Sequence, residues 1–336
     1  MKIYPNLKNL IKMSDLDTKF YFRISTILLV VFSIWHFSSP RENNNLLDPE
    51  AETRPPKDTS ATLTNFAPPI LVVFNDNENT LPRRNWSAPA LEINAEAALA
   101  MRDDGGRIYY NKNMEARRPI ASLTKLMTAI VVLENYRLDE IIKIPIEAVR
   151  REGSRGDLRP SEEITVRALL NIMLIDSSND AAVALAAQNP DFVSLMNKKA
   201  AGLGLKNTYF TNPDGVDEGN GYSTALDVAK IFSYLIGRHP EISEVLKTKN
   251  MVVYSADGKI AHRLENTNAL LGEVGEIKAG KTGYTDKAGG ALALLISGLS
   301  FGDKNNIITV VLGSSDRFGE SEKIINWLRT AYIWER

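Results

Sequence analysis

The sequence predicts an α+β fold for residues 86–336. Two observations lead to this prediction. Apolar segments with helical periodicity cluster in the middle of this region, whereas short β-prone segments lie at both of its ends. The region contains no visible internal repeat. A sheet must therefore be assembled from distant parts of the chain around a helical insertion.

The order of the expected elements comes from local patterns. Residues 98–102 and 107–111 are apolar or β-prone and flank Asp-Asp-Gly-Gly, whose residues tolerate the positive φ of a tight turn, so a hairpin is expected. A helix is expected at 122–134, because a serine suited to a helix N-terminus precedes a long apolar face. Further helices are expected at 166–174, 180–188, 190–201, 225–236 and 322–332. Further strands are expected at 252–254, 260–262, 277–281, 291–297 and 307–312.

The first 85 residues are expected to lie outside this fold. Residues 20–38 form a mostly apolar run, and the lysines before it keep residues 1–19 in the cytoplasm and export the rest of the chain. Phe37 occupies the −3 position of the available cleavage site, where a small residue is needed, so an uncleaved signal-anchor is favoured over a signal peptide. The proline-rich residues 39–85 are expected to be an extracytoplasmic linker, and residues 86–336 the catalytic domain. The protein is thus expected in the cell membrane as a single-pass chain, with its domain periplasmic or on the outer face.

Composition excludes several classes of function. Lys and Arg number 40 and Asp and Glu 41, a net charge of −1, which gives no basic surplus for nucleic acid. The absence of cysteine removes disulfides, thiol nucleophiles and cysteine-based zinc sites. Only three histidines occur and none lies in an HExxH pattern, which argues against a zinc peptidase or a histidine-based triad.

Three short motifs carry the chemistry: Ser122-x-x-Lys125, Ser177-Ser178-Asn179 and Lys281-Thr282-Gly283. Each is common alone, but all three in this order are expected only roughly 0.03 times by chance in such a chain. Their contexts agree, because the first begins an expected helix, the second precedes another and the third ends an expected strand. Together they indicate a serine nucleophile with its own base.

The first motif supplies the nucleophile. Positions i and i+3 share a helix face, so the amine of Lys125 can reach the hydroxyl of Ser122. The N–H groups at a helix N-terminus also favour developing negative charge. A lysine serves as a base only if burial or a nearby cation lowers its pKa, and Lys281 is the expected cation.

The other two motifs supply proton transfer and binding. Ser177 would pass the proton to the leaving amine, and Asn179 offers both a donor and an acceptor to a substrate amide. The strand edge of the third motif can bind an extended peptide antiparallel, with Lys281 and Thr282 holding its terminal carboxylate. Gly283 allows that backbone to approach closely.

Other polar residues are expected to be structural. His239 and His262 are expected to be structural or surface residues, and residues 212–215 a turn.

The motifs and their flanks resemble those of the serine-type D-alanyl-D-alanine carboxypeptidases, which are low-molecular-mass penicillin-binding proteins. The resemblance runs from about residue 88 to near the C-terminus. The matching segments are 117–129, 177–182, 211–215, 266–271 and 281–285. It implies a β-lactamase/transpeptidase-like α+β fold, in which an antiparallel sheet with packed helices adjoins a mostly helical lobe and the active site lies between them.

The resemblance also implies a role for each site residue. Ser122 would be the acyl-ester nucleophile, Lys125 the proton acceptor and Ser177 the third catalytic residue. The implied substrate-binding residues are Asn179, Lys281, Thr282, Gly283 and Tyr284, and the backbone N–H groups of Ser122 and Tyr284 would form the oxyanion hole.

The implied reaction removes the last D-alanine from a peptidoglycan stem pentapeptide, with no metal or cofactor. The peptidoglycan stem peptide would be the substrate, β-lactam antibiotics would be covalent inhibitors, and the N-terminal segment would contact the membrane.

Two departures from the family pattern stand out. Ser178 replaces the usual glycine, which would add a side chain near the active site. The chain ends at Arg336, which leaves no room for the C-terminal domain and anchor helix of many members, so the N-terminal segment would provide the membrane attachment.

Three alternative functions stay open. A D,D-endopeptidase would use the same residues on crosslinks. A class A β-lactamase would need a Glu-x-x-Leu-Asn element, which is missing after Ser177. A non-catalytic penicillin- or peptidoglycan-binding module would not need the three motifs intact.

Overall fold

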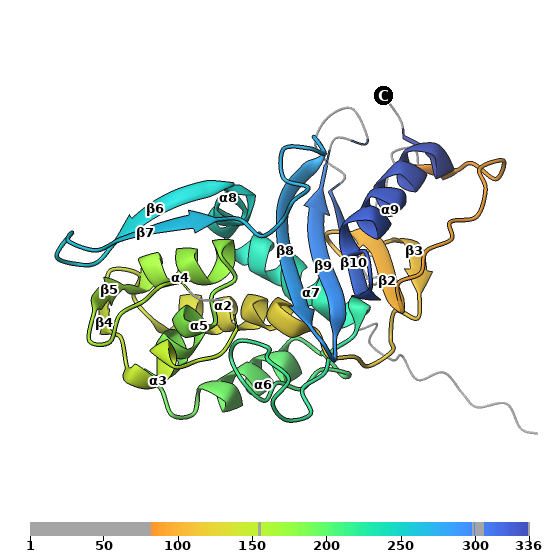
Figure 1. Cartoon of the computed structure of the whole chain (residues 1–336). Helices are drawn as coiled ribbons and strands as arrows, with labels where there is room; N and C mark the ends of the chain where they lie inside the picture. Colours follow the sequence, from red (N-terminus) through yellow and green to blue (C-terminus); the bar gives the residue numbers. More distant parts are fainter. Residues whose placement is uncertain (1–81, 154–155, 298, 300–305, 335–336) are drawn as a thin grey trace, which may run out of the picture. The chain divides into compact units, whose positions relative to one another are not determined.

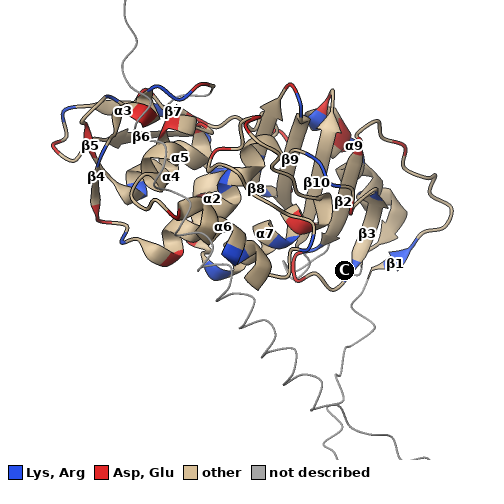
Figure 2. Cartoon of the chain, turned by 90° about the horizontal axis from the view of Figure 1, so that it is seen from below, with Lys and Arg blue, Asp and Glu red and all other residues tan. Residues whose placement is uncertain are grey.

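The computed structural model describes residues 82–153, 156–297, 299 and 306–334, all of which belong to one compact unit, Phe74–Arg336. The predicted segments 1–19 and 20–38, and residues 39–81 of the predicted linker, lie outside the described residues. Within the described part, no helix combines the length and the apolar character needed to cross a bilayer. Basic and acidic residues are interspersed over both halves of this unit (Figure 2).

A five-stranded antiparallel sheet forms one half of the unit (Figure 1). Its strand order is β3-β2-β10-β9-β8. The strands are β2 (Ala97–Arg102), β3 (Ile108–Lys112), β8 (Ile277–Thr285), β9 (Gly289–Ile296) and β10 (Ile307–Ser314). Two strands come from the start of the domain and three from its end, which confirms the prediction of an α+β fold whose sheet is assembled around a helical insertion.

Helices cover both faces of this sheet. The side chains of β2 alternate between two apolar cores: Leu99 packs with α7 (Ala225–Arg238), and Ala98 with α9 (Arg317–Ala331). Because both faces are covered, β9 and β10 are apolar along nearly their whole length rather than alternating. The edge strand β8 remains available on its outer side within the described sheet.

The other half of the unit is mostly helical. At its centre lies α2 (Thr124–Asn135), whose residues 124–132 are all buried, so this helix is enclosed on every side. Around it lie α3 (Ile146–Val149), α4 (Val166–Ile175), α5 (Asn179–Ala186), α6 (Phe192–Gly202) and α8 (Glu241–Lys247). Two hairpins, β4 (Ile141–Lys143) with β5 (Glu163–Thr165) and β6 (Asn250–Tyr254) with β7 (Ala261–Glu265), complete this lobe.

The expected helices and strands all occur, with two informative differences. The first helix does not begin at Ser122, because a 3-10 turn, η2 (Ala121–Leu123), precedes α2. The expected strand end at Lys281 is wrong, because β8 continues to Thr285 in register with β9. A glycine that suggests a strand end therefore lies inside this strand.

The described chain begins with a short strand on the body. In β1, Arg83–Arg84 pair antiparallel with β11 (Tyr332–Ile333), and the guanidinium of Arg84 lies 4.9 Å from the ring centroid of Trp327. The last residues of the predicted linker thus pack beside the C-terminal helix.

Candidate active site

Ser122 and Lys125 lie in direct contact at the start of α2. The lysine Nζ donates to Ser122 Oγ at 2.7 Å, to Asn179 Oδ1 at 2.6 Å and to the carbonyl oxygen of Asp214 at 2.9 Å. These three bonds use all the donors of an ammonium group. A neutral amine has a lone pair in place of one donor, and that lone pair can take the proton of Ser122.

Burial prepares Lys125 for this role. The side chain is 0 % exposed, and this burial lowers its pKa from 10.5 to about 7. The carboxylates of Asp214 and Asp180 oppose the effect, and the guanidinium of Arg151 adds to it. Near neutral pH, a large fraction of Lys125 is therefore the free amine.

Ser177 and Lys281 form a second serine–lysine pair. Ser177 directly precedes the N-cap residue of α5 and has a φ of 60°, a strained value for a residue with a side chain. Lys281, on β8, donates to Ser177 Oγ at 2.7 Å and to the carbonyl oxygen of Thr282 at 3.1 Å. Burial, the charge of Lys125 and the charge of Arg317 lower its pKa well below 10.5. The charges of Lys125 and Lys281 oppose each other, and Arg151 is a further cation that lowers the pKa of Lys125.

Asn179 connects α5 to its surroundings. Its Oδ1 accepts from Lys125, and its Nδ2 donates to the carbonyl oxygen of Glu152 at 2.7 Å. The amide therefore orients Lys125 and the loop at residue 152, in addition to any contact with substrate.

The third motif lies on the free edge of the sheet. Thr282 is buried, with its Oγ1 2.5 Å from Thr267 Oγ1. Tyr284 is 61 % exposed, so most of its side chain is open to solvent. A Cβ added at Gly283 would lie 3.0 Å from Ser122 N and 3.1 Å from the carbonyl oxygen of Ile120. The glycine thus lets the nucleophile turn approach β8, whereas the sequence had suggested a close approach of substrate.

The structure therefore brings all eight predicted residues together where α2 and α5 of the helical lobe meet β8 of the sheet. Two serine–lysine pairs face a free strand edge, the arrangement expected for acyl transfer on an extended peptide.

Known proteins are similar to this chain. Residues 84–316 match the family described as D-alanyl-D-alanine carboxypeptidase. The chain belongs to this family. It is 33% identical over 253 residues to the D-alanyl-D-alanine carboxypeptidase DacF of Bacillus subtilis, a match that covers 71% of this chain but only 63% of that protein. It is 31% identical to a D-alanyl-D-alanine endopeptidase of Pseudomonas aeruginosa, covering 72% of this chain and 79% of that protein.

A solved structure of the same fold supports the assignment. The crystal structure of the Streptomyces K15 DD-transpeptidase is 31% identical to this chain, with a TM-score of 0.66, and the match covers 73% of this chain and 99% of that one. The predicted fold class is thereby confirmed.

The family's usual glycine is replaced by Ser178 without crowding the site. The side chain is fully buried, and its Oγ accepts from the backbone N–H of Ala181 at 3.0 Å, which caps α5. It also bonds the carboxylate of Asp180, which accepts from the backbone N–H of Gly156. The substitution therefore acts on helix and loop structure, because the added side chain faces inward.

The ion pair between Arg151 and Asp214, next to Lys125, was not predicted from the sequence. Asp214 is 0 % exposed, and its carboxylate receives Arg151 Nε at 2.5 Å and Nη2 at 3.1 Å. Arg151 also binds both oxygens of Glu218, at 2.8 and 2.9 Å. The expected turn at 212–215 is present, but it also presents the Asp214 carbonyl to Lys125. An aspartate in Asn-Pro-Asp-Gly looks like any turn residue, so no local signal reveals this pair.

Arg317 was also missed. It is the first residue of α9, a Cβ at Gly290 of β9 would lie 3.2 Å from its Cβ, and its charge lowers the pKa of Lys281. Its Nε is buried, with no hydrogen-bond partner among the described residues. The guanidinium also lies 4.7 Å from the ring centroid of Phe318. A guanidinium whose Nε has no partner is suited to bind an anion.

His262 is structural, as expected. Its Nε2 lies 2.7 Å from Glu162 Oε1 and its Nδ1 3.0 Å from the carbonyl oxygen of Gly156. The pair links the β6–β7 hairpin to the loop that ends at β5.

Proposed function

We propose that this chain is a serine D-Ala-D-Ala carboxypeptidase, which removes the terminal D-alanine from peptidoglycan stem pentapeptides through an acyl-enzyme on Ser122. The observation that carries the proposal is the buried amine of Lys125, whose pKa is about 7, at 2.7 Å from Ser122 Oγ. A neutral amine at this distance can act as a general base near physiological pH.

Acylation begins when Lys125 takes the proton of Ser122 as Oγ attacks the carbonyl carbon of the penultimate D-alanine. The backbone N–H groups of Ser122 and Tyr284 would stabilise the oxyanion. The C–N bond then breaks, and the proton that Lys125 took from Ser122 would pass through Ser177 to the leaving amine of D-alanine, which returns Lys125 to the free amine. Lys281 would hold Ser177 in place for this transfer. Water then attacks the ester with Lys125 as the base, and Ser122 regains its proton.

Binding of the terminal carboxylate explains the cations at the other end of the site. Arg317, Lys281 and Thr282 lie together near the sheet edge, and the Arg317 guanidinium has an unpartnered Nε in the described structure. Burial disfavours the protonated form of Lys281, and a bound carboxylate would stabilise that form. The specificity for a free C-terminus follows from this contact.

D-alanine release from a soluble stem pentapeptide tests the proposal. We expect release by the wild-type protein, and a rate at least a thousandfold lower for Ser122→Ala. Ser194→Ala, at an exposed position of α6, is the matched control and should behave as wild type. No D-alanine release by the wild-type protein would refute the carboxypeptidase proposal.

A D,D-endopeptidase is the second candidate, because a similar protein of Pseudomonas aeruginosa carries that name. The same groups would attack the same carbonyl, but the leaving amine would belong to a crosslinked peptide. Incubation with purified crosslinked dimers distinguishes the two: a carboxypeptidase leaves them intact, whereas an endopeptidase yields monomers.

The nucleophile should also react with β-lactams. The ring carbonyl would acylate Ser122 and the opened ring would hinder water. Labelling with a fluorescent penicillin should therefore be stable for minutes in the wild-type protein and absent in Ser122→Ala.

We also propose that residues 20–38 attach the chain to the membrane, with the catalytic domain outside the cytoplasm. The support is the apolar run preceded by lysines. The full chain should sediment with membranes and be degraded by an externally added protease in spheroplasts. Recovery of the full chain in the soluble cytoplasmic fraction would contradict this proposal.

A further inference from the structure

One segment of the helical lobe lies directly against the second motif. The carbonyl oxygen of Glu152 accepts from Asn179 Nδ2 at 2.7 Å, and a Cβ added at Gly153 would lie 2.5 Å from the same nitrogen. Further along the segment, a Cβ added at Gly156 would lie 3.1 Å from Ser178 Oγ. Because Asn179 Nδ2 is bound here, its Oδ1 faces the amine of the catalytic lysine. The segment therefore determines which way the Asn179 amide is turned.

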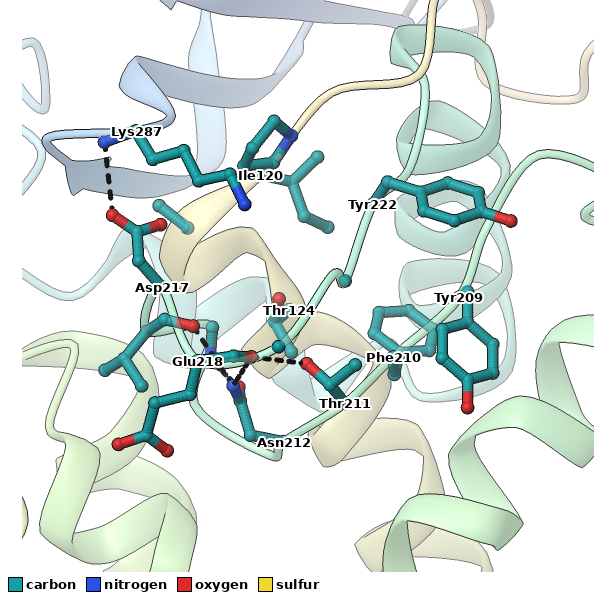
Figure 3. A pocket seen from close by; sticks show the side chains of 16 residues that line it. Ile120, Thr124, Tyr209, Phe210, Thr211, Asn212, Asp217, Glu218, Tyr222 and Lys287 are labelled. Atoms are coloured by element: carbon teal, nitrogen blue, oxygen red, sulfur yellow. Dashed lines mark hydrogen bonds between the residues drawn. The ribbon is translucent and has the colours of Figure 1, made fainter.

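This segment is supported differently from the loop that presents the Asp214 carbonyl. In that loop the carbonyl oxygen of Glu218 accepts from Thr211 Oγ1 at 2.8 Å and from Asn212 Nδ2 at 3.3 Å (Figure 3). By contrast, the described residues of 152–158 make no backbone–backbone hydrogen bond. The position of this segment therefore depends on side chains that come from other elements.

Two buried side chains hold the backbone of Gly156. Its N–H donates to both carboxylate oxygens of Asp180, at 2.9 and 3.1 Å, and its carbonyl oxygen lies 3.0 Å from His262 Nδ1. Both side chains are buried, so these bonds are shielded from water. A Cβ added at Gly156 would overlap Ile172, and two residues later Leu158 is buried in the core of the helical lobe. The segment is thus anchored at residues 156–158 and reaches Asn179 from there.

Glu162 orients the ring of His262 for this contact. A carbonyl oxygen only accepts, so Nδ1 carries a hydrogen where it meets Gly156. Nε2 lies 2.7 Å from Glu162 Oε1, so a second proton lies between this nitrogen and the carboxylate. Glu162 Oε2 accepts from the backbone N–H of Arg159 at 3.0 Å, which fixes the carboxylate in turn. The pair therefore aims the Nδ1–H of His262 at Gly156.

We propose that His262 is a positioning residue for acyl transfer, in addition to its structural link between hairpin and loop. Its Nδ1–H holds Gly156, the segment 152–156 holds the Asn179 amide, and Asn179 Oδ1 holds the amine of Lys125. The inference rests on the proposed function, in which Lys125 is the base and Asn179 contacts substrate. Without the bond to Gly156, the segment moves away from Asn179, whose amide then loses its fixed orientation.

Two variants separate the roles of the two ring nitrogens. The amide nitrogen of His262→Asn takes the place of Nδ1, so this variant still donates to Gly156 but loses its bond to Glu162. The amide nitrogen of His262→Gln takes the place of Nε2, so this variant still donates to Glu162 but loses its bond to Gly156. A purely structural role predicts that His262→Asn is the more damaging, because it leaves the buried carboxylate of Glu162 without its partner. The proposal predicts the reverse order for the rate of acylation.

The rate of acylation by a fluorescent penicillin measures the effect, and thermal unfolding verifies that each variant is folded at the assay temperature. We expect His262→Gln to slow acylation about tenfold, since a substitution far from the reacting atoms can misplace them. His262→Asn should stay within about twofold of the wild-type rate. Arg263→Gln, at the exposed neighbouring position of β7, is the matched control and should behave as wild type.

A double-mutant cycle tests whether His262 acts through Asn179. In Asn179→Ala the amide that the segment orients is absent, so adding His262→Gln should slow acylation by less than about twofold further. If His262→Gln slowed acylation by the same factor in both backgrounds, the route through Asn179 would be wrong.

Equal acylation rates for His262→Asn and His262→Gln would overturn the proposal, because the bond to Gly156 would then have no effect of its own. If either variant does not fold, Gly153→Ala decides the matter, since its Cβ displaces the segment from Asn179 at an exposed position. A slower rate for Gly153→Ala supports the proposal, and the wild-type rate overturns it. A wild-type protein that neither reacts with penicillin nor releases D-alanine would instead refute the proposed function itself.

Discussion

The two walls of the active site are built in different ways. On the wall of the helical lobe, Ser122 and Ser177 lie in turns, and two residues with side chains, Ala121 and Ser177, have positive φ values of 48° and 60°. On the sheet wall, residues 279–285 of β8 pair continuously with β9, after a register shift between Ile277 and Ala279, and Tyr284 is exposed. Backbone strain therefore occurs at the nucleophile turn and at Ser177, whereas regular backbone is found where a peptide would bind. The lesson is that positioning the two serines requires irregular backbone, whereas binding an extended peptide requires a regular strand.

The largest expected effect comes from the buried base. Lys125→Met keeps the length of the side chain but removes the proton acceptor, so the rate of acylation should fall about a thousandfold or more. Stopped-flow acylation by a fluorescent penicillin measures this, with thermal unfolding to verify the fold. A fall of less than tenfold would mean that another group is the base.

A substitution on the sheet wall should matter when it separates the two walls. The Cβ of Gly283→Ala would lie 3.0 Å from Ser122 N, so the nucleophile turn must move away from β8. We expect acylation to slow by about tenfold, since a displacement of about 1 Å can cost a hundredfold and this contact requires a smaller one. Gly237→Ala, at an exposed position of α7 where an added Cβ meets nothing within 4 Å, controls for loss of glycine itself. Equal rates for Gly283→Ala and wild type would show that the close approach is dispensable.

The pH dependence reports on the wall of the helical lobe alone. Acylation needs neutral Lys125, whose pKa is lowered to about 7, so the rate should rise with pH through about 7 and level off above it. Arg151→Gln leaves the negative charge of Asp214 unopposed, which stabilises the ammonium form and raises this pKa. The rise should then occur at higher pH, with a rate at pH 7 lower by about fivefold for a shift of the pKa by about one unit.

Arg151→Lys keeps the charge and should restore much of the wild-type profile, which separates electrostatics from loss of structure. The exposed neighbour variant Arg150→Gln should leave the profile in place. A slower Arg151→Gln protein with an unmoved pH profile would show that the arginine only supports the fold.

The smallest effect on the acylation rate is expected at Tyr284, an exposed residue of the site. The Tyr284 ring is 61 % exposed, and only the backbone N–H of this residue is assigned a role, so Tyr284→Ala should change the acylation rate by less than about threefold. The same penicillin assay measures it. A loss above tenfold would place the ring itself in the reaction and blur the contrast between the two walls.

Local patterns were sufficient for much of this protein. The apolar or β-prone residues 98–102 and 107–111 around a turn sequence, and the apolar periodicity of 166–174, predicted their elements, because turn chemistry and burial are local properties of the chain. The three motifs identified the nucleophile and its partners, because their chemistry depends on residue type and short spacing. The strand end at Lys281 was mispredicted, because Gly283 is needed for a contact with a segment about 160 residues away in sequence.

The sequence by itself determined the α+β class, the family and the residues of the three motifs. Only the tertiary structure decided what surrounds them: that α2 is enclosed, that Arg151 neutralises Asp214 behind Lys125, that Arg317 lies beside the third motif, and that His262 binds the carbonyl oxygen of Gly156. The physical reason is that a pKa and the position of a side chain depend on burial and on groups brought together from distant segments. Such neighbours leave no periodic or local trace in the chain.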